Sequence, residues 1–333
     1  MADAPHIDRA ARSRTGTLRP DDDAAADPRV RVTLGHLRSL ECRAKKLSFL
    51  PRQPARSILN GRHASRLRGR GLNFEELRGY LPGDDVRAID WKVTARTGEP
   101  YIRVMPEERD RPALIVVDQR MSMFFGSRLN MKSVTAAEAA ALAAFRILDQ
   151  SDRVGGIVFG DAHLAEIRPQ RSRVALNRFL TALTDANSLL HAEAPPLDPM
   201  PLTNVLRAVA NIASRDHLII LLSDFDVIDA DTDRLISGLA RRNDLVLGLV
   251  TDPTVQEVPE GLNMVVSDGV LQAEIDTGTD ATRKSLREMS QGRLAQVFDW
   301  QRRFGAAVLP LTSGEETLPQ IRRLMGLGPG ARR

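Results

Sequence analysis

The chain has little of what disulfide-stabilised, metal-stapled and membrane proteins depend on. Its 333 residues include a single cysteine, Cys42, so no disulfide can form within the chain and a cysteine-based zinc site has no ligand set. The first 30 residues hold no apolar signal-peptide core. No later stretch approaches the roughly 20 apolar residues that a membrane-spanning helix needs. We therefore expect a cytoplasmic protein without signal peptide or membrane insertion.

Common enzyme signatures are also missing. No strand is followed by a G-x-G-x-x-G dinucleotide loop, and the P-loop, H-E-x-x-H and G-x-S-x-G patterns do not occur. The six histidines are scattered, and none stands at a ligand spacing from another. These absences argue against nucleotide-binding enzymes, zinc peptidases and serine hydrolases, so we expect no enzyme.

The composition that is present, with 42% hydrophobic and 27% charged residues, is typical of a globular chain. The charge is unevenly spread, because Arg38 to Arg70 contains ten Lys or Arg and a single acid, Glu41. This basic segment suggests nucleic-acid or anionic-surface binding as an alternative function. Phe49 is its one aromatic residue, so it offers no stacking platform for bases, which argues against nucleic acid.

Four parts are predicted along the chain. Residues 1–28 are expected to be a disordered tail, because they have no aromatic residue and too little apolar surface to offset the entropy of ordering. Residues 29–111 form a basic N-terminal segment, residues 112–312 an α/β domain, and residues 313–333 a C-terminal helix and tail.

The α/β class follows from apolar runs rich in Val and Ile that alternate with helical patterns. The most hydrophobic strand, His217 to Asp224, is expected at the centre of the sheet. The pattern predicts further strands at Ala113–Asp118, Asp244–Val250 and Ala306–Leu311, hairpins over Arg153–Pro169 and Asn263–Ile275, and helices over 132–148, 172–184, 204–213, 233–242 and 282–304. We expect a doubly wound, mainly parallel sheet with helices on both faces.

Polar residues follow two of these strands. Asp118 ends the first, Ser122 lies four residues later, and Asp224 ends the central strand; Thr203 precedes the helix that leads into it. Ligands of open α/β sheets bind beyond the carboxyl ends of the strands, and Mg²⁺ prefers carboxylate and hydroxyl oxygens. The four residues therefore form a candidate magnesium site. Taken singly, each is more often a helix cap.

Together these residues resemble the metal-ion-dependent adhesion site of von Willebrand factor type A domains, whose pattern is D-x-S-x-S, then Thr, then Asp. Here the middle position is Arg120. A guanidinium about 5 Å from a divalent ion costs roughly 7 kcal/mol at an effective dielectric constant of about 20. Arg120 therefore either turns outward or replaces the ion by pairing with Asp118 or Asp224. We favour replacement, which leaves a metal-free, degenerate site and no cofactor; the alternative cofactor is Mg²⁺.

A second signature precedes the α/β domain. It reads R-x-Y-x-P-G-D-D-x-R-x-I-D-W and consists of Arg78, Tyr80, Pro82, Gly83, Asp84, Asp85, Arg87, Ile89, Asp90 and Trp91. This run closely resembles the domain of unknown function 58 family. The resemblance implies a von Willebrand type A-like domain behind a family-specific segment, commonly partnered with a MoxR-type AAA+ ATPase in chaperone-like assembly. It points to the shorter members without a transmembrane hairpin.

The charged residues of this signature allow two readings. Asp84, Asp85, Arg87 and Asp90 around Trp91 form either an ion-pair network that fastens the segment to the domain or a docking surface for a partner. We list these five with Arg120 as candidate partner-binding residues. Overall, the sequence predicts a non-enzymatic interaction module that binds a MoxR-type ATPase through the carboxyl edge of the sheet. Hydrolase or nuclease chemistry at a metal on Asp118 and Asp224 is a third, less favoured hypothesis, because Arg120 argues against the metal.

Overall fold

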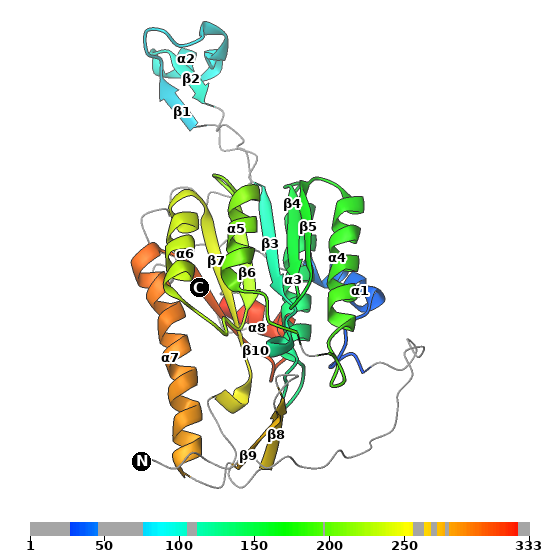
Figure 1. Cartoon of the computed structure of the whole chain (residues 1–333). Coiled ribbons are helices and arrows are strands. Elements are labelled where there is room, and N and C mark those ends of the chain that lie inside the picture. The colour runs from blue at the N-terminus through cyan, green and yellow to red at the C-terminus, as the bar shows by residue number, and fades with distance from the viewer. Residues whose placement is uncertain are drawn as a thin grey trace.

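The computed structural model describes residues 27–45, 76–104, 112–195, 197–255, 263–267, 272–276 and 280–325. Its centre is a six-stranded sheet in the order β10-β7-β6-β3-β4-β5 (Figure 1). The strands are β3 (Ala113–Asp118), β4 (Val154–Phe159), β5 (Leu164–Gln170), β6 (Leu218–Ser223), β7 (Asp244–Thr251) and β10 (Ala307–Thr312). All neighbours pair in parallel except β4 and β5, which form the expected antiparallel hairpin. The predicted α/β class is confirmed.

Strand β6 lies between β7 and β3, as its hydrophobicity predicts. Both neighbours of β3 are parallel to it, and every residue of β3 is buried. Because these strands are buried on both faces, their sequences are continuous apolar runs and do not alternate between apolar and polar residues. Because β3 and β6 are parallel neighbours, the residues that follow them meet at the same edge of the sheet.

Helices cover both faces of the sheet (Figure 1). One face carries α3 (Lys132–Asp149), α4 (Arg173–Ser188), α1 (Leu34–Ala44) and α8 (Thr317–Leu324), and the other carries α5 (Leu202–Ile212), α6 (Ala230–Arg242) and α7 (Asp280–Phe304). The alanine-rich middle of α3 is buried. Alanine side chains are small, so the helix can lie close to the sheet. Gly156 of β4 serves the same end, since a Cβ there would lie 2.2 Å from the Phe179 ring of α4.

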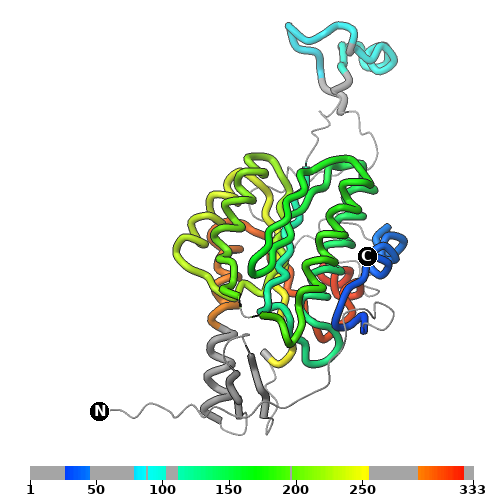
Figure 2. Tube along the Cα trace, turned by 45° about the vertical axis from the view of Figure 1, so that its right-hand side comes forward, coloured from blue at the N-terminus to red at the C-terminus, as the bar shows by residue number. Residues whose placement is uncertain are grey.

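The N-terminal helix α1 is part of this fold. Thr33 caps it by accepting a hydrogen bond from the His36 amide at 3.1 Å, and Leu37, Leu40 and Ala44 are buried in the core. Figure 2 shows α1, in blue, beside α3 and α4. Both α1 and α8 contribute to the core, although they lie outside residues 112–312, the range that we expect for the α/β domain. The basic composition of the N-terminal segment hid the apolar stripe of α1.

Residues 76–104 form a small unit. Strands β1 (Glu76–Gly79) and β2 (Tyr101–Val104) pair antiparallel, with the short 3₁₀ helix η1 (Val86–Ala88) and helix α2 (Trp91–Thr97) between them. Gly98 ends α2 in the left-handed region, with a φ of 78°, which glycine adopts without strain. The expected hairpin over Asn263–Ile275 is also present, as β8 (Asn263–Ser267) and β9 (Gln272–Asp276). Two further 3₁₀ turns are η2 (Met121–Met123) and η3 (Pro253–Val255).

Some expectations concern residues outside the described ranges. Residues 1–26 of the tail predicted for residues 1–28 lie there, and so do residues 46–70, the larger part of the basic segment. Within the described ranges, no helix combines the length and apolar character that crossing a bilayer requires.

Candidate functional site

The carboxyl ends of β3 and β6 bring the predicted residues Asp118 and Asp224 to one edge of the sheet. Both side chains are buried, and so is Arg120, which follows β3 by two residues. Ser223, the last residue of β6, donates from its hydroxyl to Oδ2 of Asp118 at 2.6 Å. The same hydroxyl accepts from the Phe225 amide at 2.9 Å, which fixes the turn after β6.

Arg120 pairs with Asp118 in the bidentate geometry that a planar guanidinium favours. Its Nη2 lies 2.7 Å from Oδ2 and its Nε 3.0 Å from Oδ1 of Asp118. The remaining nitrogen, Nη1, donates to the carbonyl oxygen of Met200 at 3.2 Å, and the guanidinium carbon lies 5.5 Å from the centre of the Phe159 ring. The Arg120 amide also donates to Asp118 at 3.0 Å. Arg120 therefore points inward.

A second cation, Lys132, completes the site. It was not among the site residues that we predicted from the sequence. Its Nζ lies 2.6 Å from Oδ2 of Asp224, and only 12% of its side chain is exposed. The Ser122 hydroxyl lies 3.5 Å from Oδ1 of Asp224. Lys132 is the first residue of α3, where a positive charge opposes the helix dipole. This unfavourable placement was the sequence signal of a nearby acid.

The structure brings together three of the four predicted metal ligands: Asp118, Ser122 and Asp224. Thr203 is buried in the first turn of α5, three residues after Met200 in the sequence. Among the described residues, no hydrogen bond joins the Thr203 hydroxyl to the other three. Thr203 is the second residue of α5, whose N-cap is Pro201, and no side chain caps this helix.

The electrostatics of the site follow from two acids and two cations that share a buried space. Burial raises the pKa of Asp118, although the Arg120 guanidinium acts to lower it. Burial acts to lower the pKa of Arg120, but the attraction of Asp118 outweighs it, so this pKa is raised. Burial also acts to raise the pKa of Asp224, but the Lys132 ammonium outweighs it and lowers the pKa of that carboxyl. The formal charges of the four side chains cancel.

These residues do not fit a divalent cation in the observed arrangement. Both oxygens of Asp118 accept hydrogen bonds from Arg120, and Oδ2 also accepts from Ser223, so the carboxylate has no lone pair directed at an ion. Oδ2 of Asp224 is occupied by the Lys132 ammonium at 2.6 Å. Across the described ranges, no group of three or more His, Cys, Asp or Glu is placed to hold a metal. We therefore assign no chemistry to Mg²⁺ here.

The loops around the site are anchored by further buried hydrogen bonds. Asp252, directly after β7, accepts from the amide of Ser127 at 2.8 Å and from its hydroxyl at 2.6 Å. It also accepts from the Ser313 hydroxyl at 2.6 Å. On the other side, Gln119 accepts from Asn187, which in turn accepts from the Val32 amide. The β3–α3 loop is thereby tied to β7, β10, α4 and the segment before α1.

Exposed apolar side chains stand on the loop that follows β6 and on the loop that precedes α5. Val227, three residues after Asp224, is 61% exposed, and Leu197, three residues before Met200, is 50% exposed. Their loops are linked to the buried site, because Met200 accepts from Arg120 and Asp224 accepts from Lys132. The edge thus combines a closed polar centre with accessible apolar side chains.

Three of the five candidates in the small unit, the carboxylates, bind nearby backbone amides. Asp84 accepts from the Leu81 amide at 2.8 Å, Asp85 accepts from the Arg87 amide at 2.9 Å, and Asp90 caps α2 by accepting from the amides of Lys92 and Val93. These carboxylates shape the turns of the unit. Trp91 is 69% exposed. Partner binding by this set stays a prediction.

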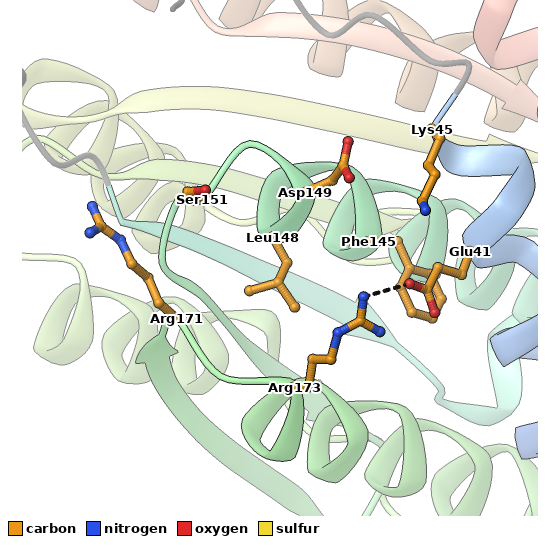
Figure 3. A pocket seen from close by; sticks show the side chains of 8 residues that line it. All are labelled: Glu41, Lys45, Phe145, Leu148, Asp149, Ser151, Arg171 and Arg173. Atoms are coloured by element: carbon orange, nitrogen blue, oxygen red, sulfur yellow. Dashed lines mark hydrogen bonds and ion pairs between the residues drawn. The ribbon is translucent and has the colours of Figure 1, made fainter.

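A separate cavity of about 310 Å³ lies at the opposite edge of the sheet, where β5 ends beside the start of β4. Figure 3 shows Arg173 of α4 pointing toward Glu41 of α1, and the two side chains pair at 2.8 Å. Lys45 and Arg171 add positive charge and Asp149 adds negative charge. Because an ion pair spans this cavity and helps to join α1 to α4, we interpret it as part of the packing of α1.

Comparison with known proteins places the chain in a family. The family model described as "Protein of unknown function DUF58" matches residues 76–295, which is more than half of the chain. The chain belongs to the DUF58 family. This confirms the resemblance that the R-x-Y-x-P-G-D-D-x-R-x-I-D-W signature carried.

Two mycobacterial relatives of this DUF58 protein carry the description "Uncharacterized protein". The protein Rv1480 of Mycobacterium tuberculosis and the protein Mb1516 of Mycobacterium bovis are each 28% identical to it over 312 residues, which covers 92% of both chains. Among solved structures, the SpRpn10 VWA domain is similar to 68% of the chain over its own full length, with a TM-score of 0.35 and 9% identity.

Proposed function

We propose that this DUF58 protein is a non-enzymatic interaction module that serves as an adaptor or chaperone-like partner of a MoxR-type AAA+ ATPase. The binding surface is the carboxyl edge of the sheet. The proposal rests on the family membership for the class of partner and on the described side chains for the surface.

One observation carries the choice of surface. Val227 and Leu197 expose large apolar side chains on loops that the buried ion pairs hold in place. Apolar anchors on a preorganised surface are what protein interfaces use for affinity, because little side-chain entropy is lost on binding. The centre of the site supports a binding role over catalysis, since each carboxylate is already bound to a cation of the chain.

The geometry changes the role proposed for Arg120. The sequence made Arg120 a candidate partner-binding residue. Its side chain is only 4% exposed, and its nitrogens donate to Asp118 and Met200. We therefore propose that Arg120 positions the loops and that the exposed apolar side chains make the contact.

A binding measurement with a matched control tests this proposal. The full chain and its Val227→Ser and Val174→Ser variants are titrated with the purified MoxR-type ATPase of the same organism in the presence of Mg²⁺ and ATP. Val174 is 62% exposed, nearly the same as Val227, but it lies at the start of α4 on the opposite edge. We expect Val227→Ser to weaken binding about tenfold, as loss of a buried apolar anchor does, and Val174→Ser to leave it unchanged. Absence of binding by the wild-type chain would refute the partner, and equal effects of both variants would refute the surface.

A further inference from the structure

The carboxyl edge holds two cations of the chain where open α/β sheets receive ligands. Arg120 and Lys132 come from different elements, the turn after β3 and the first turn of α3. Each is bound to a different strand-end carboxylate, at 2.7 Å for Arg120 with Asp118 and 2.6 Å for Lys132 with Asp224. Two positive charges therefore face two buried negative charges. Together the two cations supply the same charge as one divalent ion.

The two ion pairs also connect separate loops. Arg120 reaches from the β3–α3 loop to the carbonyl oxygen of Met200, just before α5. Lys132 joins the start of α3 to the residue that follows β6. A bound metal ion orders loops in this manner, by drawing oxygen atoms from several elements to one point. Here side-chain nitrogens do so.

The remaining oxygen atoms are suited to a cation once the nitrogens are gone. Ser122 lies within 3.5 Å of Asp224, and Ser223 links Asp118 to the turn after β6. Carboxylate and hydroxyl oxygens are the ligands that Mg²⁺ and Mn²⁺ accept. Without Arg120 and Lys132 the two buried carboxylates would share uncompensated negative charge, which strongly favours binding of a divalent ion.

We infer that Arg120 and Lys132 together take the place of a divalent cation, so that this edge is organised without metal and conceals a cation site that opens when both side chains are replaced. This inference concerns the internal charges of the site and goes beyond the proposed binding function, because it holds for any partner. Neither cation is sufficient alone, since each neutralises only one of the two acids.

The test compares the wild-type chain with Arg120→Ser/Lys132→Met and Lys132→Met variants of the full chain. Serine at position 120 restores a hydroxyl at the middle of the D-x-S-x-S spacing, and methionine keeps the length of the lysine side chain without its charge. Mn²⁺ binding is measured by calorimetric titration. Thermal unfolding is measured in EDTA and in millimolar Mg²⁺, which reports binding by mass action.

We expect the unfolding midpoint of the wild type and of Lys132→Met to be the same in EDTA and in Mg²⁺. The double variant should bind Mn²⁺ at least about tenfold more tightly than the wild type and unfold at a higher temperature in Mg²⁺. Adding Asp118→Asn should abolish both effects. If the double variant folds only with metal, refolding on addition of Mn²⁺ is the expected signature.

Three results would overturn the inference. The first is wild-type Mn²⁺ binding that Asp118→Asn abolishes. The second is tight binding by Lys132→Met, which would mean that Arg120 does not block the site. The third is a double variant that neither binds Mn²⁺ more tightly than the wild type nor is refolded by it. None of these measurements involves the ATPase, so failure of the inference and failure of the proposed function are distinguishable.

Discussion

Arg120 donates to the carbonyl oxygen of Met200, 80 residues away in the sequence, while the other side of its guanidinium holds Asp118. One side chain therefore joins the end of β3 to the loop that enters α5. This relationship makes Arg120 a structural centre of the carboxyl edge. Its replacement should lower the free energy of unfolding.

We predict that Arg120→Met destabilises the fold by about 3–5 kcal/mol, because it leaves the fully buried carboxylate of Asp118 without its cation. Urea unfolding measures this free energy. Combining Arg120→Met with Asp118→Leu removes both charges and should recover much of the loss, since an apolar pair of similar volume tolerates burial. A single variant as stable as the wild type would contradict the role given to the ion pair.

Glycine substitutions test how closely α4 approaches the sheet. Gly156→Ala should destabilise by about 1–3 kcal/mol, because the added Cβ would lie 2.2 Å from the ring of Phe179. Gly238, inside α6, has no heavy atom within 4 Å of an added Cβ and serves as the control. Gly238→Ala should stabilise by about 0.5–1 kcal/mol through its helix propensity. Equal effects of the two changes in urea unfolding would refute the close packing of α4.

The helix α1 should contribute to the stability of the whole domain. Leu37 is fully buried between α1 and the core, so Leu37→Ala is expected to cost about 2–5 kcal/mol. Its control is Leu189→Ala, since Leu189 is 52% exposed and should change stability little. If Leu37→Ala unfolds at the same denaturant concentration as the wild type, α1 is not a part of the cooperative unit.

The sequence revealed the sheet better than it revealed what surrounds it. Strands β3 and β6 are continuous apolar runs, and their order along the chain limits where Asp118 and Asp224 can lie. The sequence limited the ion-pair partner of Arg120 to Asp118 or Asp224. Which of the two it binds depends on the rotamer of the long arginine side chain. Lys132 was missed because a lysine at a helix start has no motif of its own and its acid is 92 residues away. In α1 the apolar stripe was obscured by arginines on its outer face, where Arg43 and Glu316 pair.

Acid pH should weaken the fold partly through Asp252. Burial raises the pKa of this carboxyl, but the hydrogen bonds from Ser127, Ser313 and Thr254 outweigh it and lower the pKa below its ordinary value of 3.8. A carboxyl with a lowered pKa in the folded state stabilises the fold above its unfolded pKa, and this contribution is lost as the pH falls through the folded value. The contribution of Asp252 is therefore complete above about pH 4 and disappears below it.

The variant that isolates this contribution is Asp252→Asn, which keeps the shape of the side chain but cannot accept on both sides. We expect a loss of about 1–3 kcal/mol at pH 7, because the amides and hydroxyls that point at the carboxylate are left partly unsatisfied. The difference in unfolding free energy between wild type and variant should shrink as the pH is lowered below about 4, since the wild-type carboxylate then becomes protonated. A difference that stays constant from neutral to acid pH would show that the bonds to Asp252 do not depend on its charge.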